Sequence, residues 1–189
     1  MTLLQQLEAY QPTTEQEIND KQLIISCFKA NQETTLTREN KVAHFTASGF
    51  VVNETFDKVL MVYHHLFKSY SWTGGHADGD ADLLGVAIKE ACEETGIKQV
   101  KPLTPNIVAL DVLPVWGHFK RETFVSAHLH LNATYLLVAD DTQPLQIKPD
   151  ENSDVAWIPL HQLEAYCCEK EMIPVYQKVL KQLEIFKPA

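Results

Sequence analysis

The stretch "GGHADGDADLLGVAIKEACEETGI", residues 74–97, decides the fold and carries six carboxylates. Its second half has the spacing of a helix over residues 82–95. Asp82 is placed to cap the first turn, because its carboxylate can accept a free backbone N–H. Gly96 is placed to end the helix, where a positive φ is often needed.

The predicted helix has two different sides. Its apolar side, suited to packing on a sheet, is formed by Leu84, Ala87, Ile88 and Ala91. Glu90, Glu93 and Glu94 share a second side, at positions i, i+3 and i+4. They are either a solvated acidic face or ligands of a hard divalent cation. Negative charge is unfavourable near a helix C-terminus, and the glycine-rich "TGGHADGD" precedes the helix, so we favour the cation.

These residues resemble the signature of the Nudix hydrolase family, G-x5-E-x7-R-E-U-x-E-E-x-G-U, where U is a bulky aliphatic residue. The positions that match in register are Gly75, Glu90, Glu93, Glu94, Gly96 and Ile97. Three positions depart from the signature. Ala81 stands where the first glutamate belongs, Lys89 replaces the arginine, and Ala91 replaces the bulky aliphatic residue.

The resemblance implies an α+β fold, with an α/β/α sandwich around a mixed sheet. We expect a Nudix domain over residues 40–189 and an N-terminal helical extension over residues 1–39. The implied reaction is hydrolysis of a diphosphate linked to another group, with Mg²⁺ or Mn²⁺ as cofactor. The implied partner is a small-molecule diphosphate substrate.

The matched positions imply roles within this site. Glu93 and Glu94 would ligate the metal, and the carbonyl of Gly75 would add a ligand. Glu90 would be either a further ligand or the base that deprotonates the attacking water. Lys89 would orient Glu90, although a lysine lacks the bidentate contact of an arginine.

Other acidic residues offer alternatives. Asp80 or Asp82 could compensate for Ala81, but turn and capping chemistry explains both equally simply. The loop of "KPDENSDVAWIPL" resembles one that supplies a further acidic ligand in Nudix proteins. Glu151 is the first candidate for that ligand and Asp154 the second, while an exposed acidic loop is the plain alternative.

Several basic and aromatic residues are candidate substrate contacts. In "AHLHLNATYLL", His128 and His130 alternate with apolar residues and therefore share one face of a strand. They could contact substrate, bind zinc or be structural, and no third zinc ligand is evident in the sequence. His76 lies in the glycine-rich segment. Arg121 could neutralise a phosphate near Trp116, or this loop could be anchored by a half-buried tryptophan.

The rest of the chain alternates helices and strands. Residues 3–30 read as helical, residues 44–53 and 58–65 as a hairpin, and residues 72–75 as a break. Further strands are expected within residues 108–116, 122–140 and 155–160, and a helix within residues 164–186 that breaks or restarts at Pro174.

Composition limits the function. The net charge of -9 argues against non-specific nucleic-acid binding. No apolar run approaches the roughly 18 residues of a membrane span, and the N-terminus lacks a secretory pattern. Four cysteines without a CxxC pair fit reduced thiols in a cytoplasmic protein. The apolar N-terminal helices could form a homodimer contact.

Three classes of function stay open. A metal-dependent diphosphohydrolase is favoured, because all three glutamates are intact. A degenerate Nudix domain that binds a nucleotide or protein without turnover would explain the departures from the signature. An enzyme of the isopentenyl-diphosphate isomerase type ranks lower, because Cys92 lies inside the helix and the other cysteines are remote. The sequence does not identify the diphosphate.

Overall fold

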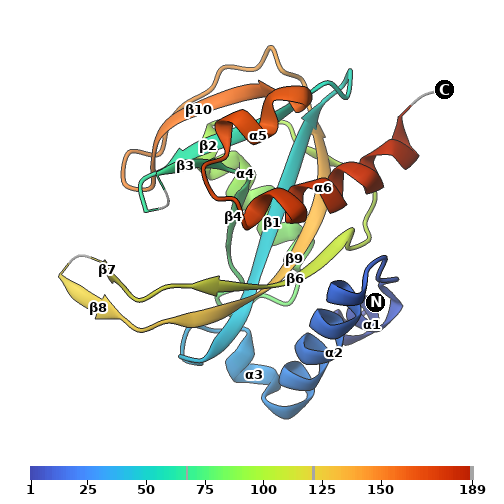
Figure 1. Cartoon of the computed structure of the whole chain (residues 1–189), viewed down its shortest axis with the longest axis vertical. Coiled ribbons are helices and arrows are strands. Elements are labelled where there is room, and N and C mark those ends of the chain that lie inside the picture. Colours follow the sequence, from blue (N-terminus) through green and yellow to red (C-terminus); the bar gives the residue numbers. More distant parts are fainter. Residues whose placement is uncertain (67, 121, 188–189) are drawn as a thin grey trace.

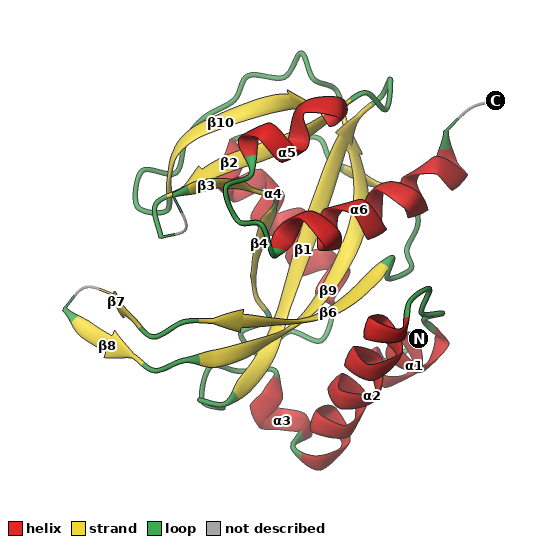
Figure 2. Ribbon diagram, viewed as in Figure 1, coloured by secondary structure: helices red, strands yellow, loops and turns green. Residues whose placement is uncertain are grey.

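A mixed sheet with helices on both faces forms the body of the molecule (Figures 1 and 2). The computed structural model describes residues 1–66, 68–120 and 122–187. The helices are α1 (Leu3–Ala9), α2 (Glu15–Ala30), α3 (Gln32–Thr35), α4 (Leu83–Thr95), α5 (Leu163–Tyr166) and α6 (Met172–Leu183). The strands are β1 (Ala43–Asn53), β2 (Lys58–His64), β3 (Ser69–Ser71), β4 (Thr73–His76), β5 (Lys101–Pro102), β6 (Ala109–Val115), β7 (His118–Lys120), β8 (Thr123–Val125), β9 (His128–Ala139) and β10 (Asn152–Pro159).

Strands β1 and β9 form the parallel centre of the sheet. They pair from Ala43 with Leu129 to Asn53 with Ala139, and the strand order is β10-β2-β1-β9-β5. Beside the N-terminal half of β1 lies β4, and beside the N-terminal half of β9 lies β6, both antiparallel. The expected mixed sheet and the α+β class are confirmed.

Side-chain alternation along β1 creates two hydrophobic clusters, one on each face of the sheet. Phe45 and Ala47 pack with Ala87 of α4. On the other face, Phe50 packs with Tyr176 of α6. One face of the sheet is therefore covered by α4 and the other by α6.

Helix α4 forms as the sequence predicts. The Asp82 carboxylate accepts the Gly85 N–H at 3.1 Å, and Gly96 has φ 77°. The predicted break at residues 72–75 is wrong, because Thr73–His76 is strand β4. A Cβ at Gly74 would lie 2.8 Å from the carbonyl oxygen of Ala47, so the glycine permits close approach of two strands rather than a turn.

The N-terminal helices pack into the same core as the sheet. Leu7, Ile24 and Phe28 belong to the hydrophobic cluster on the α4 face. Helix α2 also contacts β6, where Asp20 accepts the Val112 N–H at 3.1 Å. The helical extension is thus present, and its boundary at residue 39 stays a prediction.

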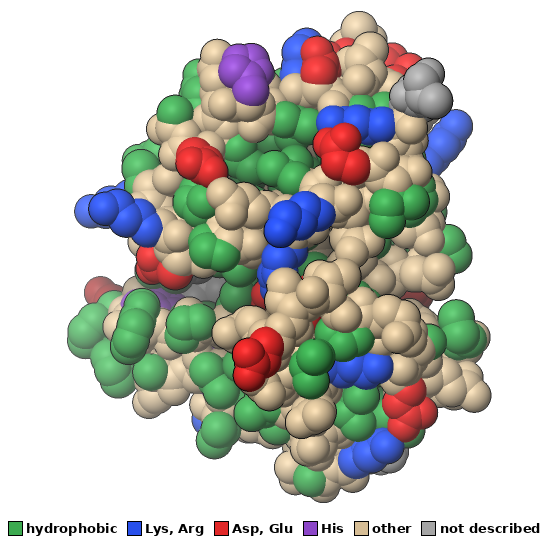
Figure 3. All heavy atoms as spheres, turned by 45° about the vertical axis from the view of Figure 1, so that its right-hand side comes forward, with side chains coloured by type: hydrophobic (Ala, Val, Ile, Leu, Met, Phe, Trp, Pro, Cys, Tyr) green, Lys and Arg blue, Asp and Glu red, His purple; other side chains and the backbone are tan. Residues whose placement is uncertain are grey.

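The hairpin β7–β8 protrudes from the sheet (Figure 1). Trp116, Phe119 and Phe124 are exposed there, so the prediction of a loop anchored by a half-buried tryptophan is wrong. Hydrophobic side chains gather at the level of this hairpin at the left of Figure 3. Arg121, a predicted substrate contact, lies outside the described residues.

No helix within the described residues is long and apolar enough to cross a membrane.

Candidate functional site

Helix α4 holds two glutamates against the glycines of β4. Glu94 is 3% exposed, and its Oε2 accepts the Gly74 N–H at 3.0 Å. A Cβ at Gly75 would lie 2.4 Å from Cδ of Glu90 and 2.6 Å from its Oε1. A residue larger than glycine at position 75 would displace the Glu90 side chain, so Gly75 allows this carboxylate to lie against β4.

Burial makes negative charge unfavourable in this cluster. It raises the pKa of Glu94 to about 8; the Gly74 N–H opposes the shift, while the charges of Glu90 and Glu151 add to it. Burial also raises the pKa of Glu90, and Lys89 and Lys148 counteract part of that effect. The cluster therefore needs a nearby cation if both carboxylates are to be ionised at neutral pH.

The loop between β9 and β10 completes the cluster. Nζ of Lys148 lies 3.1 Å from Oε1 of Glu151 and 3.9 Å from Oε2 of Glu93. Asn152, which is 1% exposed, donates to the carbonyl of Glu94 at 3.0 Å and accepts the Lys148 N–H at 3.1 Å. One buried amide thus fastens this loop to the end of α4.

The sequence predicted Glu151 as a ligand, and it missed Lys148 and Asn152, which lie in the same loop. One feature of the sequence could have indicated Lys148: it is the first residue of the acidic stretch "KPDENSD", and a lysine is a natural ion-pair partner for the predicted glutamate cluster. The position of Asn152 gave no signal, because its partner Glu94 is distant in sequence and meets it only in the folded chain.

Lys89 lies beside the carboxylates that it was predicted to orient. Its Nζ is 3.8 Å from Oε1 of Glu90 and 3.6 Å from Oε1 of Glu93. The Lys89 side chain is 64% exposed, so water screens both contacts. The geometry allows an orienting role with only a modest energetic contribution.

The aspartates around the cluster have structural partners. Asp82 caps α4, and Asp80 accepts the Asp82 N–H at 2.8 Å. Asp154, the second candidate for a late ligand, accepts the hydroxyl of Tyr70. Ala81 is exposed. Glu151 is thus the candidate that lies with the glutamates, and compensation for Ala81 by Asp80 or Asp82 stays a prediction.

The residues present fit a hard divalent cation. Glu90, Glu93 and Glu94 offer carboxylate oxygens, the ligand type that Mg²⁺ prefers. Gly75 lets the Glu90 carboxylate lie against β4, and the ammonium of Lys148 already lies among the carboxylates. A Mg²⁺ or Mn²⁺ site requires oxygen ligands and a negative local charge that the cation can neutralise, and this cluster offers both.

Four histidines gather on the opposite face of the sheet. His44 of β1 pairs in register with His130 of β9, and His76 of β4 pairs with Thr46 of β1. Ring nitrogens of His44, His76 and His130 all lie within 4.8 Å of one another, and this triad could hold a metal ion. The His128 ring stacks on His44 with centroids 4.8 Å apart.

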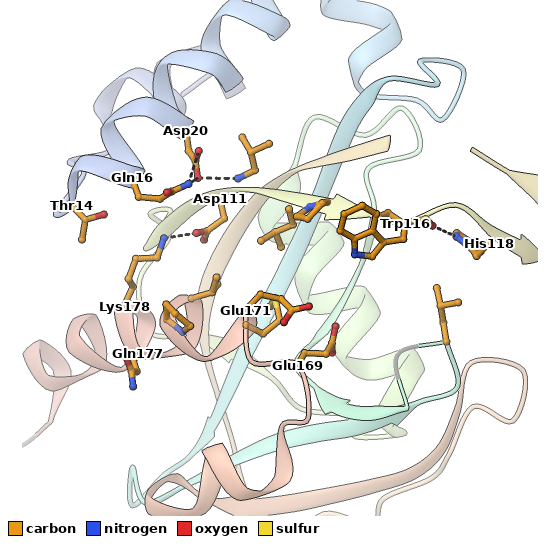
Figure 4. A pocket seen from close by; sticks show the side chains of 18 of the residues that line it. Thr14, Gln16, Asp20, Asp111, Trp116, His118, Glu169, Glu171, Gln177 and Lys178 are labelled. Carbon is orange, nitrogen blue, oxygen red and sulfur yellow. Dashed lines mark hydrogen bonds and ion pairs between the residues drawn. The ribbon is translucent and has the colours of Figure 1, made fainter. Parts of the chain in front are cut away.

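A cavity of about 690 Å³ lies between α2, β6 and α6 (Figure 4). Asp111, Trp116, His118 and Lys178 are among its lining residues, and Lys178 points to Asp111. No residue of the stretch 74–97, which is described throughout, lines it. The cavity is therefore separate from the glutamate cluster.

The family follows from comparison with known proteins. The family model of the NUDIX domain matches residues 43–183, so the chain belongs to the Nudix family. A search of curated proteins found no match.

Solved structures share the fold. A NUDIX-family hydrolase from Clostridium perfringens is 22% identical, with 74% of this chain and 97% of that chain covered and a TM-score of 0.53. The NUDIX domain of Shewanella oneidensis NrtR, solved with ADP ribose, is 17% identical, with 84% and 97% covered and a TM-score of 0.54. A C. elegans Ap4A hydrolase is 15% identical, with 74% and 97% covered and a TM-score of 0.51. At these identities the likeness shows the fold alone.

Proposed function

We propose that this protein is a Mg²⁺- or Mn²⁺-dependent diphosphohydrolase. Its substrate class would be nucleoside diphosphate-linked or related small molecules. The observation that carries the proposal is the set of carboxylates held against the glycine backbone of β4, where burial raises the pKa of Glu94 to about 8. A bound cation would offset the unfavourable burial of these carboxylates, and strongly shifted pKa values are typical of functional sites.

Glu93, Glu94 and Glu151 would hold the cation, together with the carbonyl of Gly75. When bound, such an ion lowers the pKa of a water ligand and neutralises phosphate charge. Glu90 is half-buried with a raised pKa, so it suits the base that takes a proton from the attacking water. The new oxygen–phosphorus bond replaces the bridging one, and two phosphate-bearing products leave.

Lys89 and Lys148 would orient the neighbouring glutamates and partly neutralise their negative charge. Lys89 is placed to orient Glu90, and Lys148 is placed to orient Glu151. Burial lowers the pKa of Lys148, but the hydrogen bond and charge of Glu151 outweigh it and raise the pKa overall. Lys148 therefore stays protonated at neutral pH and can also attract a phosphate.

The predicted substrate contacts of the histidines are restricted by their position in the fold. His76, His128 and His130 lie on the other side of the sheet from the glutamates. If these histidines contact the substrate, they would contact a region of it that is distant from the diphosphate being hydrolysed. Two structures of the same fold, one with ADP ribose and one of an Ap4A hydrolase, make nucleoside-linked diphosphates the first compounds to test.

Location and assembly also stay predictions. We expect a cytoplasmic protein without non-specific nucleic-acid binding, given the net charge of -9. For a homodimer contact, α2 leaves Ile18 and Leu23 exposed, while Leu7 and Ile24 are buried in the protein's own core.

The test is a substrate panel with Mg²⁺, assayed by release of phosphate or monophosphate. Glu93→Gln should lower kcat about a hundredfold or more and weaken Mg²⁺ binding. Glu90→Gln should lower kcat comparably and leave Mg²⁺ affinity near that of the parent. Glu54→Gln, in an exposed turn, is the matched control and should have parental activity.

Equal rates for Glu93→Gln and the parent would remove Glu93 from the mechanism. Absence of turnover on every compound, with nucleotide binding retained, would instead identify a binding module. Isomerised product without phosphate release would identify the isomerase type.

A further inference from the structure

We propose that His44, His76 and His130 bind a transition-metal ion, with Zn²⁺ the first ion to test, at a site separate from the glutamate cluster. His128 is the candidate for a fourth ligand. This site goes beyond the proposed hydrolase activity and does not depend on it.

The three histidines are arranged nearly as they would be around a bound metal ion. The ring nitrogens of the three histidines lie within 4.8 Å of one another. Ring centroids are 5.1 Å apart for His44 and His76, 5.3 Å for His44 and His130, and 5.0 Å for His76 and His130. Nitrogens around a tetrahedral Zn²⁺ lie about 3.3 Å apart, from Zn–N bonds near 2.0–2.1 Å. Small side-chain rotations would therefore close the site.

The hydrogen bonds of His44 are those of a metal ligand. Its Nδ1 lies 3.0 Å from the carbonyl oxygen of Asn40, and a carbonyl only accepts, so Nδ1 carries the proton. Nε2 is then a lone-pair donor. Metal-binding histidines commonly donate their second ring N–H to a backbone carbonyl in this way. His128 has the same arrangement, with Nδ1 2.9 Å from the carbonyl oxygen of Ser126.

Two buried nitrogens in the cluster have no hydrogen-bond partner. Within the described part of the chain, Nε2 of His44 and Nε2 of His130 are both unpaired, and His44 is 4% exposed. Asn132, two residues along the same face of β9, shows the contrast. It accepts hydroxyls from Thr46 and Ser48, both at 2.9 Å. Two unpaired ring nitrogens beside each other on one face of the sheet are placed to share one metal ion.

The two metal sites differ in position and donor type. Side chains alternate along β4, so Gly75 lies under Glu90 while His76 joins the histidines on the other face. Imidazole nitrogens suit zinc, copper, iron and nickel, whereas carboxylates suit magnesium and manganese. Because its ligands come from β1, β4 and β9, the ion would tie three strands together.

The test uses the full chain after removal of metals with a chelator. Isothermal titration with Zn²⁺ should give one tight site, and Co²⁺ should give the visible absorption of nitrogen coordination. His44→Gln and His130→Gln should each weaken Zn²⁺ binding about a hundredfold or more. Glu93→Gln and His161→Gln, an exposed histidine outside the cluster, should bind as the parent does.

Thermal unfolding supplies a second readout. Zn²⁺ should raise the Tm of the parent and of Glu93→Gln, and should leave the Tm of His44→Gln unchanged. Circular dichroism in chelator checks that each histidine variant is folded, and His76→Gln serves if one is not. Absence of tight Zn²⁺ binding by the parent, or undiminished binding by the folded histidine variants, would overturn the proposal. Loss of binding in Glu93→Gln alone would place the ion at the glutamates.

Discussion

Raising the pH should destabilise the metal-free protein through Glu94. Burial raises the pKa of this carboxyl to about 8, from an ordinary value of 4.5. Between these values the folded protein keeps a proton that the unfolded chain has lost. Because the folded state binds more protons, the free energy of unfolding falls as pH rises through this range.

The histidines restrict the useful pH window. Burial lowers the pKa of His44 and His130, so the unfolded chain binds more protons than the folded protein up to about pH 7.5. Their effect on stability has the opposite sign and fades between pH 6.5 and about 7.5, a range in which the two histidines together add about 0.8 kcal/mol of stability. Between pH 6.5 and 8, the two pKa values of Glu94 predict a loss of about 1.5 kcal/mol. The raised pKa of Glu90 acts in the same direction.

The assay is urea unfolding in chelator at pH 6.5 and pH 8. The parent should lose about 1.5 kcal/mol more than Glu94→Gln between the two. Glu94→Gln should change little or gain slightly, because a glutamine does not titrate while the histidines and Glu90 still do. Glu93→Gln is the matched control, since Glu93 is 44% exposed and close by, and it should behave as the parent does. Saturating Mg²⁺ should reduce the parental loss. An equal loss in Glu94→Gln and the parent would refute the assignment to Glu94.

Two further substitutions test the fold around the site. Gly75→Ala would place a Cβ 2.4 Å from Cδ of Glu90, so the Glu90 carboxylate must move by about 1 Å. We expect kcat to fall about a hundredfold. If the folded variant kept the parental kcat, Glu90 would have no role in the reaction. Lys178→Met would leave Asp111 and Glu17, both nearly fully buried, without their cation. Urea unfolding should show a loss of about 3–5 kcal/mol, against little change in Lys181→Met, which is exposed. A loss no larger than the control's would show that this pairing does not hold the N-terminal helices.

Local patterns predicted the elements of the Nudix fold well. Helix α4 begins after Asp82 and ends at Gly96 because a capping carboxylate and a left-handed glycine act within one turn. The alternation around His130 and Asn132 placed the polar residues of β9 on one face, as the structure shows. The glycines before α4 were misread, since the same residue type serves turns and closely paired strands.

The sequence by itself determined the acidic helix, its caps and its glycine-rich approach, because each depends on residues a few positions apart. Only the tertiary structure decided which distant groups meet there. Asn152 joins Lys148 to the carbonyl of Glu94, and the parallel register of β1 and β9 brings His44 beside His130. These pairings depend on strand order and register, which are set by packing of the whole core rather than by any local pattern.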